Sequence, residues 1–163
     1  MNNRPVYNSE KHIKLLEYAE LLEEQNKRLE DEEPQQYRAL LSYSIQINDH
    51  VHWSHRGDYL TLIRDFLNLK INGEIFEKTF YKMYQTIEKQ CNLLDKDYEK
   101  LKNIQPNPLS GDFTKAIENI WWCCEDFYPD FDEKDPPEDP YAKNETDFRN
   151  AVASFFPQLE AYL

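Results

Sequence analysis

DYLTLIRDFLNLKINGEIFEKTFYKMYQTIEKQCNLLDKDYEKL, residues 58–101, is the stretch that decides the fold. Its first part carries apolar side chains at helical spacing, at Tyr59, Leu62, Ile63, Phe66 and Leu67. Its second part places a longer apolar stripe on one helical face, at Phe76, Phe80, Met83, Ile87, Cys91, Leu94, Tyr98 and Leu101. Between them, Asn72-Gly73 supplies left-handed backbone geometry at little steric cost, so we predict an antiparallel helical hairpin that reverses there.

The segments on both sides of this hairpin also have helical patterns. We expect a first helix from Asn8 or Ser9 to about Glu32, and a second over residues 35–48 behind Pro34. The first helix has an apolar stripe at Ile13, Leu16, Ala19, Leu22 and Leu29. The second helix of the hairpin should fray near residues 103–104. After a loop rich in proline, Asp112 should cap a further helix, and Asn144 should cap a last one, which Pro157 ends or kinks.

These helices predict an all-α fold. Only three glycines, together with many Leu, Glu, Lys, Tyr and Phe residues, favour helices over a β architecture. We expect an antiparallel bundle with a four-helix core over residues 57–163 and an N-terminal helical extension of two helices over residues 1–56. The two parts are expected to pack as one domain, as a monomer or a weak homodimer.

Charge and cysteine usage narrow the class of partner. The chain has 19 Lys and Arg against 31 Asp and Glu, a formal net charge of -12. This charge repels phosphate backbones and anionic lipids, so we expect neither nucleic acid nor membrane as a partner, and a basic protein instead. Cys91, Cys123 and Cys124 fall on apolar stripes and are expected to be buried free thiols of a cytoplasmic protein. No apolar run of the length of a signal peptide or membrane span is present.

No motif in the sequence indicates catalysis or a cofactor. A Gly-rich phosphate loop, a CxxC pair, an HExxH motif and a nucleophile elbow are all missing from it, so the protein is predicted not to be an enzyme. His50, His52 and His55 lie within six residues, but no other Cys or His completes a zinc site at a recognisable spacing. We therefore assign this segment to a polar turn that anchors Trp53, and predict no metal.

The second distinctive stretch is an acidic segment that follows the adjacent tryptophans. Eight acids and only two lysines lie between Pro129 and Asp147, and four prolines over residues 129–140 forbid a helix there. Tyr128, Phe131 and Tyr141 are expected to pin this loop to the bundle. Trp121 and Trp122 cannot both face one core, so one of them should lie at an edge, under a loop or in an interface.

These residues resemble a known family. The segments 59–68 (YLTLIRDFLN), 70–72 (KIN) and 74–80 (EIFEKTF) are similar to the opening helical hairpin of the colicin D immunity protein family. Residues 117–129 (IENIWWCCEDFYP), the acidic loop and a closing helix with Phe148 and Val152 are similar to the family's second half. The resemblance covers about residues 57–163. It implies a four-helix antiparallel bundle that binds a toxin nuclease domain and blocks its basic, RNA-binding active site with acidic side chains.

The residues themselves are compatible with that function. A rigid surface of carboxylates is attracted by the positive field of a basic cleft and can compete there with polyphosphate. The candidate partner-binding acids are Asp126, Asp130, Asp132, Glu133, Asp135, Glu138 and Asp139, with Trp122 or Tyr128 as an aromatic anchor. The alternative hypothesis is a non-catalytic helical adaptor or assembly protein. In that case the apolar stripe of the first helix would bind the partner, and the acidic loop would only aid solubility.

Overall fold

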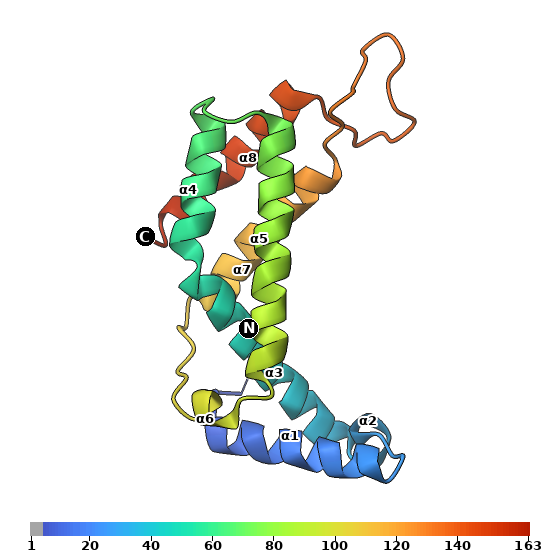
Figure 1. Ribbon diagram of the computed structural model, residues 1–163, viewed down its shortest axis with the longest axis vertical. Helices are drawn as coiled ribbons and strands as arrows, with labels where there is room; N and C mark the ends of the chain where they lie inside the picture. The colour runs from blue at the N-terminus through green and yellow to red at the C-terminus, as the bar shows by residue number, and fades with distance from the viewer. Residues whose placement is uncertain (1–4) are drawn as a thin grey trace.

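The computed structural model describes residues 5–163, and every regular element within that range is a helix. The all-α prediction is confirmed. In chain order the helices are α1 (Ser9–Glu24), α2 (Leu29–Glu32), α3 (Pro34–Ser54), α4 (Arg56–Leu67), α5 (Gly73–Leu94), α6 (Tyr98–Leu101), α7 (Ser110–Glu125) and α8 (Glu145–Glu160). Figure 1 shows α4, α5, α7 and α8 in the upper part of the molecule, α1, α2 and α6 at the lower end, and α3 between the two groups.

The main core lies among the upper helices and is dominated by aromatic rings. It joins side chains of α4, α5, α7 and α8, and α3 adds Val51. Phe66 stacks on Phe76 with ring centroids 4.4 Å apart and contacts Phe148 at 5.1 Å. Since each buried aromatic ring removes roughly 150–250 Å² from water, these rings supply much of the energy that holds the bundle together.

The hairpin of α4 and α5 turns where it was predicted, but another residue makes the turn. Leu69 has a φ of 62°. Its N–H donates to the carbonyl of Phe66 at 3.1 Å, and the N–H of Lys70 donates to the carbonyl of Asp65 at 3.0 Å. These two bonds form a Schellman motif that ends α4. Asn72 instead caps α5, and the glycine after it has a negative φ. The prediction that Asn72-Gly73 supplies the left-handed geometry was therefore wrong.

The N-terminal helices differ in length from the prediction. Asn26, with a φ of 57°, ends the first helix in a second Schellman motif, so α1 stops at Glu24 and α2 forms a separate turn. Pro34 opens α3 as predicted. However, α3 continues to Ser54, so the expected helix end near residue 48 and the polar turn after it were wrong. His52 is fully buried and extends the inner face of the helix, although its residue type suggested a turn.

The apolar stripe of α1 is covered inside the molecule. Ile13 packs with Ile47 of α3 and Leu101 of α6 in a second, smaller core cluster. Leu22 and Leu29 are also buried. Because α3 contacts α1 and α2 as well as α5 and α7, it connects the N-terminal extension with the upper bundle. The division of the chain near residue 56 stays a prediction.

The remaining helix ends follow local hydrogen bonding. α5 stops at Leu94, and a separate turn, α6, follows, so the predicted fraying near residue 103 was wrong. α7 begins at Ser110 without a side-chain cap, so the assignment of Asp112 as its cap was also wrong. Asn144 does cap α8, with its Oδ1 accepting the N–H of Asp147 at 2.9 Å. This helix runs through Pro157 to Glu160, so the helix end predicted at this proline was wrong.

Three further expectations concern side chains and length. Trp122 is 65% exposed while Trp121 is partly buried, which confirms that only one of the pair faces inward. All three cysteines are free and buried, as predicted. Within residues 5–163, none of the helices combines the length and the apolar character that crossing a bilayer requires.

Candidate functional site

The acidic segment forms a loop, residues 126–144, that joins α7 to α8 and extends away from the bundle (Figure 1). Its two ends are tied together. The N–H of Lys143 donates to the carbonyl of Asp126 at 2.7 Å, and the N–H of Tyr128 donates to the carbonyl of Lys143 at 3.0 Å. The ammonium group of Lys143 also pairs with Oδ2 of Asp126 at 2.6 Å, and both side chains are more than two-thirds buried. The loop therefore starts and ends at one closed base.

Phe127 fixes this base to the core. Its ring stacks on Phe148 of α8, with centroids 4.5 Å apart and planes inclined by 18°. On its other side the ring lies against Gly73, the first residue of α5, where a Cβ would come within 2.7 Å of Cζ of Phe127. Only glycine leaves room for this contact. Gly73 therefore serves the loop base rather than the turn of the hairpin.

Beyond the base, short-range hydrogen bonds hold the loop in shape. Asp132 accepts the N–H of Lys134 through its Oδ1 at 2.9 Å, which makes a tight turn near the tip. Asp139 accepts the N–H of Tyr141 at 2.9 Å with one carboxylate oxygen and the O–H of Tyr128 at 3.3 Å with the other. The prolines between these turns restrict the backbone further. A loop restrained in this way loses little conformational entropy on binding a partner.

The structure separates the seven candidate acids into two groups. Asp126 and Asp139 are only partly exposed and already bind Lys143 and Tyr128. The other five are exposed: Asp130, Asp132, Glu133, Asp135 and Glu138. In the range that the structure describes, none of these five forms an ion pair, although Lys134 lies among them. The tip of the loop is therefore a region of uncompensated negative charge.

The candidate aromatic residues have different environments. Trp122 projects into solvent from the last turns of α7, whereas Tyr128 is half-buried and bound to Asp139. Tyr141 is 70% exposed, so the expectation that it pins the loop was wrong. Phe127 does so instead. Phe127 lies between α7 and the acidic run, and this position was the available indication of its role in the sequence.

His52, in the last turn of α3, and His55, directly after this helix, have separate partners. Nδ1 of His52 shares a hydrogen bond with the O–H of Tyr59 at 2.9 Å, and its Nε2 lies 3.2 Å from a carboxylate oxygen of Glu88. His55 binds Asp58 and Gln90 through its two ring nitrogens. Burial lowers the pKa values of His50 and His52. Among residues 5–163 no group of three or more His, Cys, Asp or Glu side chains is arranged to hold a metal ion.

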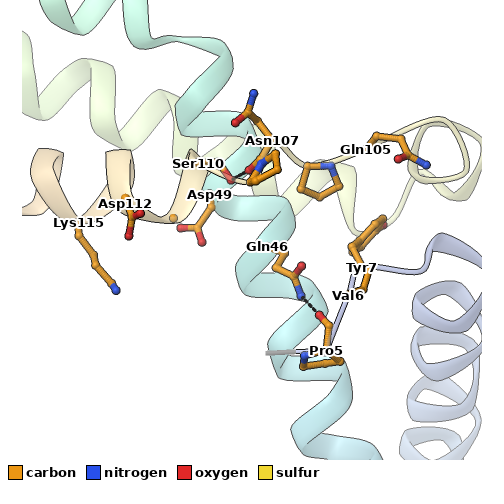
Figure 2. A pocket seen from close by; sticks show the side chains of 13 residues that line it. Pro5, Val6, Tyr7, Gln46, Asp49, Gln105, Asn107, Ser110, Asp112 and Lys115 are labelled. Carbon is orange, nitrogen blue, oxygen red and sulfur yellow. Dashed lines mark hydrogen bonds between the residues drawn. The ribbon is translucent and has the colours of Figure 1, made fainter. Parts of the chain in front are cut away.

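A pocket of about 450 Å³ lies between α3 and the loop that precedes α7 (Figure 2). At its edge the side chain of Gln46 donates a hydrogen bond to the carbonyl of Pro5 at 3.1 Å. Asp49 is buried and already has an interaction partner. The hydroxyl of Ser110 donates to the carbonyl of Asn107 at 2.7 Å, and no histidine lines the pocket. These residues therefore do not pair a nucleophile with a base.

Comparison with family models, with curated proteins and with solved structures finds no match to this chain. The resemblance to colicin D immunity proteins accordingly stays an expectation based on sequence motifs.

Proposed function

We propose that this protein is an acidic inhibitor of the immunity type, which binds the basic active site of a nuclease toxin and blocks it. The observation that supports this proposal is the tip of the 126–144 loop. Five exposed carboxylates without ion-pair partners are held there on a base that is anchored in the core. A fixed array of negative charge resembles a phosphate backbone and is attracted to the same cleft.

Held carboxylates suit this function better than flexible ones. A nuclease cleft has to attract polyphosphate, so its positive field accelerates the encounter with an acidic loop. Because the loop is already ordered by its base and turns, little of the electrostatic energy is lost in arranging it. Trp122, near the base of the loop on α7, gives an aromatic contact beside the charged ones.

The adaptor alternative has no comparable support. It depended on the apolar stripe of α1, and the side chains at Ile13, Leu22 and Leu29 pack inside the molecule. A stripe that is already covered offers little surface to another helix. We therefore do not propose this function.

The test uses a panel of purified bacterial nuclease toxin domains, and measures binding and RNA cleavage at several salt concentrations. In the loop variant, the exposed acids are neutralised by Asp130→Asn, Asp132→Asn, Glu133→Gln, Asp135→Asn and Glu138→Gln. We expect the wild-type protein to inhibit at least one domain, and the loop variant to bind it on the order of 100-fold more weakly, since five charge pairs are lost.

A matched control changes the net charge by the same amount elsewhere. It neutralises five exposed acids of the N-terminal helices: Glu10, Glu17, Glu23, Glu24 and Asp31. This control variant should inhibit almost as well as wild type. Equal losses of affinity in the two variants, or an affinity that does not depend on salt, would contradict the proposal. If the wild-type protein bound none of the toxin domains, the proposal that it is a toxin inhibitor would be refuted.

A further inference from the structure

α5 and α7 carry the same pattern of side chains on neighbouring faces. On α5, residues 77, 81, 84 and 88 share one face at helical spacing, and on α7 residues 118, 121, 122 and 125 do so. Each face has an acid at both ends and two aromatic residues between them. We call these eight residues the α5–α7 face: Glu77, Tyr81, Tyr84, Glu88, Glu118, Trp121, Trp122 and Glu125.

Contacts show that the two patterns lie side by side and run in opposite directions. The O–H of Tyr81 donates to a carboxylate oxygen of Glu125 at 2.7 Å. The ring of Trp121 lies between Tyr81 and Tyr84, with centroid distances of 4.6 and 4.7 Å. Figure 1 shows α7 passing behind α5 and then continuing into the acidic loop. The α5–α7 face therefore combines four aromatic residues with acids at both ends.

Much of this face is accessible, and its eight members include four acids and no base. Trp122, Glu118 and Glu125 are exposed, and the other members are partly buried. None of the eight is basic, although the exposed Lys115 lies one turn before Glu118 on α7 and the exposed Lys82 follows Tyr81 on α5. Lys78, the neighbouring cation on α5, pairs with Glu74 at 2.5 Å. Burial, together with the charges of Glu125 and Glu74, raises the pKa of Glu77 although Lys78 opposes this rise. A cation placed between these carboxylates would relieve their repulsion.

We propose that the α5–α7 face binds arginine side chains of a basic protein segment. A guanidinium group is planar and weakly hydrated, so it stacks on an aromatic ring while its N–H groups bind a carboxylate. Lysine is more strongly hydrated and makes this double contact less well. Nucleic acid is repelled by the four acids, and an uncharged apolar segment would cover the exposed carboxylate of Glu118 without giving it a partner.

This inference does not rest on the proposed function of the loop. The face lies on two helices, and Trp122 is the one residue that it shares with the candidate site. The loop attracts positive charge of any kind, whereas the α5–α7 face selects the chemistry of the cation. Variants of the two surfaces can therefore be made separately, and either proposal can fail alone.

The probes are two peptides of equal charge, hexa-arginine and hexa-lysine. Binding is measured at 0.15 M salt on the loop variant described above, so that the loop acids do not compete for the peptides. We expect hexa-arginine to bind about tenfold more tightly than hexa-lysine. In NMR spectra the indole N–H signals of Trp121 and Trp122 should shift on addition of hexa-arginine, while that of Trp53, which packs against Phe113 and Tyr162, should not.

Substitutions then test the face directly. In the same background Trp122→Ala should weaken hexa-arginine binding about fivefold to tenfold, and Glu118→Gln about threefold. The matched control is Tyr141→Ala, which removes another exposed aromatic side chain, from the loop, and should have almost no effect. Equal binding of the two peptides, or equal losses from Trp122→Ala and Tyr141→Ala, would overturn the proposal. So would a dimer in sedimentation experiments that Trp122→Ala dissociates, because a second copy would then cover the face.

Discussion

The contact between Gly73 and Phe127 predicts a large effect from a single methyl group. In Gly73→Ala, the new Cβ would lie 2.7 Å from Cζ of Phe127 and 3.1 and 3.2 Å from its two Cε atoms. The ring cannot turn aside freely, because it stacks on Phe148, which is fully buried. Overpacking of this kind costs about 1–3 kcal/mol. Alanine also stabilises the protein by about 0.4–1 kcal/mol, because it restricts the conformations of the unfolded chain. We therefore expect the free energy of unfolding to fall by about 1–2 kcal/mol.

Gly57 provides the matched control. It lies in the first turn of α4, is exposed, and a Cβ there would have no atom within 4 Å. Gly57→Ala should therefore stabilise the protein by about 0.4–1 kcal/mol. The two variants have the same composition and should differ by about 1.5–3 kcal/mol in the free energy of unfolding, measured by urea denaturation.

A double-mutant cycle tests the cause. Phe127→Leu shortens the side chain, so it should destabilise the wild-type protein more than it destabilises Gly73→Ala, in which the ring is already displaced. The reasoning would be refuted if Gly73→Ala were as stable as Gly57→Ala. It would also be refuted if the effects of Gly73→Ala and Phe127→Leu were simply additive.

Three other predictions follow from strain, protonation and the loop base. Leu69→Asn should stabilise the protein by about 0.5–1 kcal/mol in urea denaturation, because asparagine tolerates the left-handed φ of 62° better than leucine; an unchanged or lower stability would contradict this. Burial lowers the pKa of His12 to about 4 in the folded protein, so as the pH falls the unfolded chain binds a proton at His12 before the folded chain does. The contribution of neutral His12 to the free energy of unfolding is therefore fully present above pH 6.5 and decreases as the pH falls below this value. The loss from His12 should reach about 2 kcal/mol at pH 5, and His12→Gln should flatten the pH profile of the unfolding free energy. Lys143→Met should cost about 1 kcal/mol and speed proteolysis within residues 129–142, because it removes the ion pair with Asp126 at the loop base. Lys134→Met makes the same charge change at the exposed tip and should neither lower the stability nor speed proteolysis. Equal cleavage rates in the two variants would refute the structural role of the Lys143–Asp126 ion pair.

The sequence predicted helices well where apolar periodicity was long, and less well where one residue decided the outcome. The stripe through Phe76, Phe80 and Ile87 identified α5, and all three side chains are buried. His52 was misassigned because histidine is usually polar, while here its two nitrogens are satisfied inside the bundle by Tyr59 and Glu88. Such pairing depends on three helices meeting, which no local pattern reveals.

The candidate site shows the same limit. The run of acids and prolines predicted an exposed acidic loop, but not which acids remain free. Lys143 counted in the sequence only as one positive charge, whereas in the structure it neutralises Asp126. Gly73 was assigned to a turn because Asn-Gly is a common turn sequence. Its contact with Phe127 joins residues far apart in the chain, so it could not be predicted from either neighbourhood.

The distribution of cations indicates why the loop and the α5–α7 face belong to one end of the molecule. Many acids elsewhere on the helices have a nearby cation, as in the pairs of Glu74 with Lys78 and of Glu145 with Arg149. At the C-terminal end of α7, Lys143 is bound to the C-cap residue Asp126, whereas Glu125 in the last turn has no basic partner among residues 5–163 and accepts the O–H of Tyr81. A basic partner that approaches this end meets the face and the loop together. Its affinity should therefore depend on both surfaces, while its preference for arginine over lysine should survive neutralisation of the loop.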